Sequence, residues 1–118
     1  MAKQEKEFFD VDVIPWKPTP GSAGVWEKIL SLDEESGSYT RMLKLEPGAR
    51  IRTLLSHDFW EEVYIIQGSL VDTRKKKTFT KGMYGCRPPG MKHGPYVAPR
   101  GCLTIEVRYF PERYRRTR

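Results

Sequence analysis

Histidine and cysteine are both scarce, with two of each in 118 residues. Two cysteines, Cys86 and Cys102, are too few for a disulfide framework. We expect both to be small buried side chains in a reducing compartment rather than a bridge. Any site that depends on imidazole must use His57 or His93, so these two positions limit the chemistry available to the chain.

Long apolar runs are also missing. No segment approaches the roughly 18 apolar residues needed to span a bilayer. The first ten residues, MAKQEKEFFD, are charged and lack the apolar core of a secretory signal. We therefore expect a cytoplasmic protein with no membrane partner, and the length fits one domain.

The net charge of +6 raises the question of nucleic-acid binding. The positive charge lies mainly in residues 73–79, TRKKKTF, and in the terminal run from residue 108. The first resembles a hairpin tip, where lysines are solvated and block edge pairing. The second could contact a neighbour or an anion, or be solvated. Without a basic helix face or a nucleic-acid motif, we expect no nucleic-acid partner.

Helix signals are nearly absent, since the one candidate, SLDEESG at 31–37, is better interpreted as a loop. Short β-type runs separated by Gly and Pro instead recur along the chain and predict an all-β sandwich or barrel. The expected strands lie at 8–16, 24–32, 38–46, 49–56, 61–68, 69–73, 77–80, 82–88, 93–98 and 102–110. We predict an N-terminal strand and Pro-rich connector over 1–24, a barrel over 25–110 and a basic tail over 111–118.

Alternation along the expected strands assigns side chains to faces. In the segment before residue 58, one face carries Ile51, Thr53, Leu55 and His57. In the next strand, Glu61, Val63 and Ile65 share a face, and Glu62 and Tyr64 point outward. In the last strand, one face is apolar. The other carries Cys102, Thr104, Glu106 and Arg108, which could meet solvent or line a cavity mouth.

Two spaced motifs stand in the middle of the chain. Gly48 precedes a segment that contains His57 and Glu61 and ends at Gly68. Further on, GMYGCRPPGMKHGPYV has glycine, proline, glycine and histidine at Gly82, Pro88, Gly90 and His93. These spacings resemble the two motifs of the cupin superfamily, G(X)5HXH(X)3–4E(X)6G and G(X)5PXG(X)2H(X)3N. The resemblance covers about residues 41–110 and implies a single-domain cupin, a jelly-roll barrel also called a double-stranded β-helix.

The chain departs from the motifs at two positions. Leu55 stands where the first histidine is expected, and Val97 replaces the asparagine of the second motif. Where a conventional cupin site offers three histidines and one glutamate, the resemblance here implies metal ligation by His57, Glu61 and His93. Two imidazoles and one carboxylate form the facial triad of many Fe(II) oxygenases. The set also suits Zn, Mn, Ni or Co. Alternatively, both histidines are hydrogen-bonded residues of a polar pocket without a metal.

Within the superfamily, the runs EEVYIIQG, RPPGMKHGPY and GCLTIEVRYF resemble anti-sigma-factor cupin domains and acetylacetone-cleaving dioxygenases. The resemblance implies a mononuclear Fe(II) dioxygenase that cleaves a C–C bond in a chelating diketone or hydroxyketone. Two alternatives stay open: a metal-free isomerase or epimerase, and a ligand-binding or sensing module. Fold alone does not choose among them.

Other residues near the motifs have smaller expected roles. Tyr96 is a candidate catalytic residue, because it could serve as an acid or base, and Arg87 is a candidate substrate contact. Cys86 could face the cavity, but we favour a small buried residue. Glu106 could support a histidine or act as a base, although a surface position is favoured. The apolar N-terminal strand, FFDVDVIPW, predicts a homodimer.

Overall fold

The computed structural model describes residues 3–110, so the predicted basic tail at 111–118 lies outside the described residues. The described chain is almost entirely strand and turn, which confirms the all-β prediction. Its elements are the 3-10 helix η1 (Val11–Val13) and the strands β1 (Lys17–Pro18), β2 (Val25–Leu32), β3 (Tyr39–Leu45), β4 (Ala49–Ile51), β5 (Trp60–Asp72), β6 (Lys77–Thr80), β7 (Tyr84–Arg87), β8 (Tyr96–Ala98) and β9 (Cys102–Tyr109).

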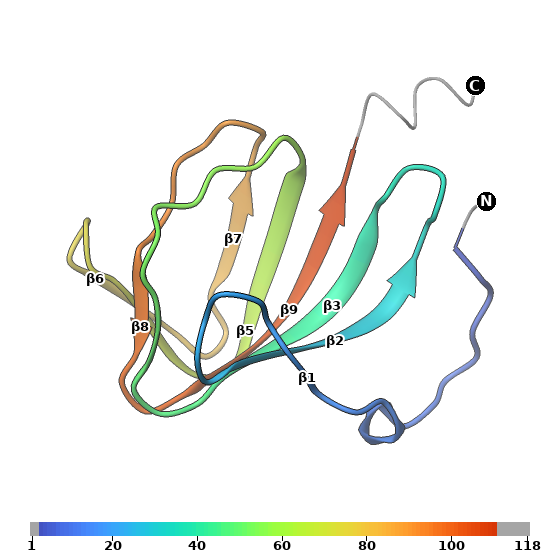
Figure 1. Cartoon of the computed structure of the whole chain (residues 1–118), viewed down its shortest axis with the longest axis horizontal. Helices are drawn as coiled ribbons and strands as arrows, with labels where there is room; N and C mark the ends of the chain where they lie inside the picture. The colour runs from blue at the N-terminus through green and yellow to red at the C-terminus, as the bar shows by residue number, and fades with distance from the viewer. Residues whose placement is uncertain (1–2, 111–118) are drawn as a thin grey trace.

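The strands form one curled antiparallel sheet in the order β1-β2-β3-β9-β5-β8-β4, with β6 and β7 also paired to β5 (Figure 1). The long strand β5 serves both halves of the curl. Its first half pairs with β9 and β7, and its second half pairs with β6 and β8. The register between β5 and β9 shifts between Ile65 and Gln67, where a β-bulge bends the strand.

The inner face of the curl has an apolar part and a polar part. The apolar core consists of Val25, Leu43, Leu45, Ala49, Ile65, Leu70, Tyr96, Ala98 and Cys102, all buried. Alternation along β5 is as predicted, because Glu61, Val63 and Ile65 are buried and Tyr64 is 45% exposed. The polar face of β9 also points inward, since Thr104 and Glu106 are buried. The solvent-facing alternative therefore does not hold for Thr104 and Glu106, and the predicted surface position of Glu106 is wrong.

Two predicted strands differ from the structure. The N-terminal run at 8–16 is not a strand: Asp10 caps the short helix η1 by accepting the backbone N–H of Asp12, and the only pairing nearby is the two-residue β1. The strand expected at 49–56 ends at Ile51. Residues 52–59 form an irregular segment with one isolated bridge at Leu55, so strand parity does not set the direction of His57.

The two cysteines have different environments. Cys102 is buried at 5% exposure, as predicted, but Cys86 is exposed on β7. The two cysteines are free thiols, as expected. Burial raises the pKa of Cys102 to about 11, and Glu106 adds to the rise. Within residues 3–110, no helix is long and apolar enough to cross a membrane.

Candidate metal centre

The carboxylate of the candidate centre belongs to Glu61, the second residue of β5. Glu61 is 3% exposed and its side chain enters the inside of the curl. Its neighbour Glu62 points to the other face, where it accepts a hydrogen bond from the Tyr84 hydroxyl. Strand alternation thus separates the two adjacent glutamates into an interior and an outer residue, as the sequence predicted.

The two histidines come from irregular segments that backbone hydrogen bonds hold together. Leu55 and His93 form an isolated antiparallel bridge, with N···O distances of 2.8 and 3.0 Å. The backbone N–H of Gly90 donates to the carbonyl of His57 at 2.8 Å. Gly90 has φ +83°, a conformation that glycine adopts without strain. The chain can therefore place both imidazoles beside Glu61 without a continuous strand through His57.

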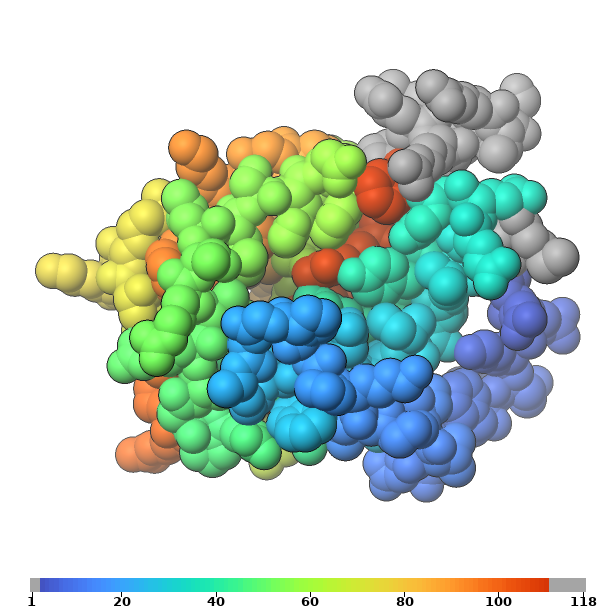
Figure 2. Space-filling model, in the orientation of Figure 1, coloured from blue at the N-terminus to red at the C-terminus, as the bar shows by residue number. Residues whose placement is uncertain are grey.

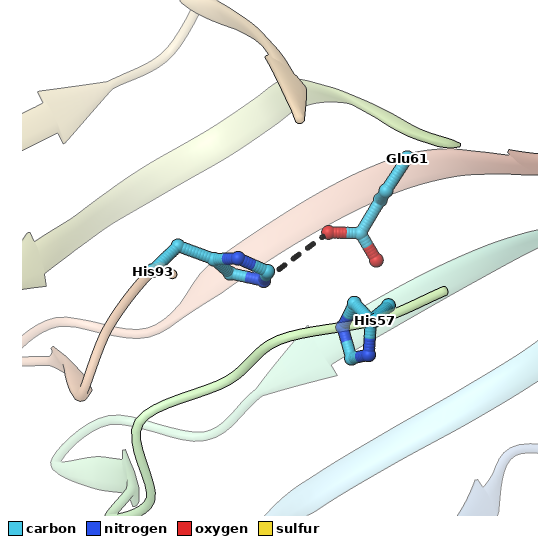
Figure 3. A group of neighbouring side chains, drawn as sticks. All are labelled: His57, Glu61 and His93. Carbon is cyan, nitrogen blue, oxygen red and sulfur yellow. Dashed lines mark ion pairs between the residues drawn. The ribbon is translucent and has the colours of Figure 1, made fainter. Parts of the chain in front are cut away.

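The three side chains point toward a common space (Figure 3). One ligand atom from each of His57, Glu61 and His93 lies within 4.8 Å of the other two. The distance from His93 Nε2 to Glu61 Oε1 is 3.7 Å. In the space-filling view, a hollow between the segment around residues 50–60 (green) and the β2–β3 strands (cyan) leaves part of β9 visible (Figure 2). The centre is thus set inside the curl, where Glu61 and His93 are each 3% exposed.

Both imidazoles have one buried nitrogen without a partner. Nε2 of His57 and Nε2 of His93 are inaccessible and make no hydrogen bond to residues 3–110. The other nitrogen of His93, Nδ1, lies 3.2 Å from the carbonyl of Met91, to which it can donate. That hydrogen bond leaves Nε2 unprotonated and able to ligate. A buried unsatisfied polar atom costs about 1–3 kcal/mol, so two at one place indicate a missing partner.

The surroundings favour neutral imidazoles. Burial lowers the pKa of His57, and it also lowers the pKa of His93, where the nearby Arg87 acts in the same direction. The ring of His57 stacks on Phe59 with centroids 4.6 Å apart. Since a metal ligand must be the neutral form, these shifts keep both rings ready to bind a cation at neutral pH.

Two arginines hold the glutamate. Arg87 Nη1 donates to Glu61 Oε1 at 2.8 Å, and Arg108 donates to Oε2 from Nε at 2.7 Å, with its Nη2 at 2.6 Å. Burial alone would raise the pKa of Glu61, but Arg108 and then Arg87 outweigh it and hold the pKa below its ordinary value. Glu61 is thus a fixed carboxylate whose Oε1 faces His93.

The arginine contacts continue through the interior as a chain of ion pairs. Arg108 Nη2 also lies 3.6 Å from Glu106 Oε1, which accepts a hydrogen bond from Arg41 Nε at 2.8 Å. Arg41 Nη1 in turn donates to Glu27 at 3.0 Å. Together with Arg87 and Glu61, the network contains three arginines and three glutamates, so its formal charges balance.

The structure brings most of the predicted site residues together. Tyr96 is buried at 5% exposure, and its hydroxyl accepts a hydrogen bond from Arg87 Nη2 at 2.9 Å. Its ring centroid is 6.3 Å from that of His93, so it borders the triad without belonging to it. Leu55, at the position of the absent histidine, packs against the apolar core. The sequence prediction missed Arg108, although its two-residue spacing from Glu106 on β9 indicated a shared inner face.

The residues present fit a divalent cation. Two neutral imidazole nitrogens and one carboxylate oxygen suit Fe, Zn, Mn, Co or Ni. The second oxygen of Glu61 is bound by Arg108, an arrangement common for carboxylates that ligate metals. Arg87 shares Oε1, so a cation there would compete with this arginine or share the oxygen with it.

The chain matches the family model of the ChrR cupin-like domain over residues 4–110, and it therefore belongs to that family of cupins. No curated protein matches the sequence. Membership confirms the predicted cupin fold and explains why its motifs surround this centre.

Solved cupin structures are similar to the chain. An RmlC-like cupin from Shewanella frigidimarina has 22% identity and a TM-score of 0.72, covering 93% of this chain and 95% of the other. An acetylacetone dioxygenase from Acinetobacter johnsonii has 18% identity and a TM-score of 0.75, covering 90% and 74%. A chain in the Rhodobacter sphaeroides complex of SigE with the anti-sigma ChrR has 21% identity and a TM-score of 0.64, covering 83% and 50%. At these identities, the likeness shows the fold alone.

Proposed function

We propose that the protein is a metal-dependent enzyme acting on a small molecule, with a divalent cation held by His57, Glu61 and His93. The observation that carries the proposal is the pair of buried Nε2 atoms without partners beside the Glu61 carboxylate. Of the reactions open to this donor set, we propose an Fe(II)-dependent dioxygenase reaction on a chelating diketone or hydroxyketone. The ligand set of two histidines and one carboxylate, and the dioxygenase among the structural relatives, support this choice.

Each residue has a defined part in that reaction. The cation would acidify a chelating substrate and leave positions open for oxygen. Arg108 holds Glu61 in one orientation, and the Met91 carbonyl orients the His93 ring. Leu55, Val63 and Ile65 provide an apolar wall that excludes water. Tyr96, with its pKa raised mainly by burial, keeps its proton and can donate a hydrogen bond to a substrate oxygen.

The first test is metal content by mass spectrometry of protein purified without chelator. We expect about one divalent ion per chain in the wild type, and loss of the ion in His57→Ala and His93→Ala. The matched control is Glu62→Gln against Glu61→Gln: the two glutamates are adjacent, but only Glu61 faces the histidines. Circular dichroism identifies any variant that fails to fold. A folded wild type that takes up neither Fe(II) nor Zn(II) would overturn the proposal.

The dioxygenase step has its own measurement. With Fe(II) bound, oxygen consumption should depend on an added diketone such as pentane-2,4-dione. If the metal-loaded protein consumes no oxygen with diketones or hydroxyketones, the dioxygenase proposal is wrong, although the proposed metal site would still stand.

A sensing module is the second candidate, because the family model is that of a ChrR domain and one relative was solved in a complex with a sigma factor. Bound metal without turnover, together with capture of a partner protein, would favour it. A metal-free isomerase is less well supported. The arginines that lower the pKa of Glu61 make it a weak base.

We also propose a homodimer formed through the N-terminal segment. Phe8 is 99% exposed and Val13 is 73% exposed, so the segment offers apolar side chains that a second copy could cover.

A further inference from the structure

A cavity of about 190 Å³ has His93, but not His57, among its lining residues. Apolar side chains from β5, β6 and the segments around β7 make up most of its wall: Val63, Ile65, Leu70, Phe79, Met83 and Met91. The volume is below the roughly 300–1,000 Å³ of pockets for drug-sized ligands. At about 30 Å³ per water-sized group, it accommodates a body of about six groups.

One end of the cavity carries a guanidinium that is already paired with Glu61 but keeps further donors. Arg87 lines this end, and two of the five N–H groups of its guanidinium are used, by Glu61 and by the Tyr96 hydroxyl. The other three make no hydrogen bond to residues 3–110, although the side chain is only 15% exposed. Gly85 leaves room for this position, since a Cβ there would lie 3.3 Å from Arg87 Nε. A half-buried guanidinium with free donors favours a carboxylate ligand.

The other charged groups at the cavity do not offset this preference. Lys75 is exposed at its edge. Asp72 is 2% exposed, and its Oδ1 accepts hydrogen bonds from the backbone N–H groups of Arg74 and Lys75. This carboxylate therefore stabilises the turn after β5. A cationic ligand would be repelled by Arg87 and Lys75, and a neutral acceptor would form weaker hydrogen bonds with Arg87 than a carboxylate does.

We propose that the cavity binds a small monocarboxylate with an apolar body of about five to seven carbon atoms, its carboxylate on Arg87 and its body among the apolar side chains. His93 and Tyr96 line the same cavity, so the head of the ligand lies next to the candidate metal centre. A 2-oxo or 2-hydroxy acid with an apolar side chain joins this charge to a chelating pair of oxygens. The inference that this end of the ligand reacts at the metal centre rests on the proposed function. Binding of the ligand at Arg87 requires no metal.

The test uses chelator-treated, metal-free protein and three probes: hexanoate, hexanamide and acetate. Calorimetry should show hexanoate binding at least roughly tenfold more tightly than hexanamide, because only the carboxylate forms a charge-assisted, bidentate pair with the guanidinium. Acetate should also bind more weakly, because it lacks the apolar body. Equal affinity for acid and amide would overturn the carboxylate assignment, and equal affinity for hexanoate and acetate would overturn the apolar pocket. No binding of hexanoate would overturn both.

Substitution of Arg87 gives a local test of the same site. Hexanoate should bind the wild type and Arg100→Gln with similar affinity, because Arg100 is exposed and does not line the cavity. In Arg87→Gln the preference for hexanoate over hexanamide should be lost. An unchanged preference in that variant would contradict the assignment of Arg87.

The two proposals can fail separately. Hexanoate binding by a protein that takes up no metal would remove the proposed reaction and keep the anion site. Metal uptake without hexanoate binding would remove the anion site and keep the metal centre.

Discussion

Arg41 and Glu106 form a charge pair inside the curl, with side chains 10% and 7% exposed. The pair supports the fold only while both members are present. A single unpaired charge left in the interior costs more free energy of folding than the intact pair contributes. Arg41 also pairs with Glu27, and Glu106 also lies near Arg108. When one member of the pair is removed, the other therefore keeps one oppositely charged neighbour.

We predict that Glu106→Leu lowers the free energy of unfolding by about 3 kcal/mol, since it leaves Arg41 buried beside Glu27 alone. The double variant Arg41→Leu with Glu106→Leu should lose less than the sum of the two single variants. Urea unfolding of the four proteins measures this coupling. Additive losses would contradict the assignment of a coupled pair.

A peripheral ion pair provides the comparison. Asp12 lies 3.9 Å from Lys28 Nζ, but its side chain is 88% exposed. Asp12→Ala should change the free energy of unfolding by less than about 1 kcal/mol, because water screens this pair.

At the level of single residues, sequence reasoning succeeded where a strand repeats with period two. It separated Glu61 from Glu62 because their strand is long and regular. It failed for Cys86 and Glu106, because it judged each side chain by its polarity. The interior of this sheet is partly ionic, so the buried Glu106 is paired with Arg41 on β3, which is distant in sequence, and with Arg108 on its own strand.

The strand β5 connects the two halves of the curl, and one glycine makes the change of direction feasible. Gly68 has φ +82°, directly after the register shift in β5. A Cβ at this position would lie 2.2 Å from the carbonyl oxygen of Gly101. The contact is with backbone, which cannot move aside as a flexible side chain would.

We predict that Gly68→Ala destabilises the fold by about 4 kcal/mol or more, because the strain of a positive φ adds to a clash with backbone. Gly48 is the matched control: it has φ +84°, but a Cβ there meets no atom within 4 Å. Gly48→Ala should cost only about 1–2 kcal/mol. Thermal and urea unfolding of the two variants separates the strain of the positive φ from the clash with the Gly101 backbone. Equal losses in the free energy of unfolding would contradict the role of the clash.

At the level of elements, the turn chemistry and the β-type runs identified most strands. The exceptions have physical causes. The segment 49–56 has strand-like composition, but after Ile51 it pairs only through the bridge at Leu55. The segment 8–16 is also β-rich in composition, but Asp10 caps a helical turn within it. Which runs find a partner is a tertiary property, and one sequence does not contain it.

The whole molecule presents its most exposed apolar side chains in the N-terminal segment, which crosses the outside of the sheet (Figure 1). Lys6 Nζ donates to the carbonyl of Leu30 at 2.7 Å, and Lys28 Nζ donates to that of Val11 at 3.0 Å, so β2 supports this segment at two points. Its apolar side chains are therefore held in a fixed place while remaining uncovered.

We predict that light scattering gives twice the mass of one chain, and that Phe8→Ser with Val13→Ser shifts the mass toward one chain. The loss of apolar contact area at the interface is the reason. Leu54→Ser serves as control, because Leu54 is also exposed at 45% but lies in a different segment. A wild type with the mass of one chain at high concentration would contradict the dimer.

The position of β9 affects the order in which the molecule can be made. This strand lies between β3 and β5, yet it is the last of the described strands to leave the ribosome. Until residues 102–109 are synthesised, the inner edges of β3 and of β5 lack the strand that joins them, and each exposes unpaired N–H and C=O groups. The nascent chain therefore has two incomplete half-sheets, and completing the sheet requires the insertion of its last strand at the centre.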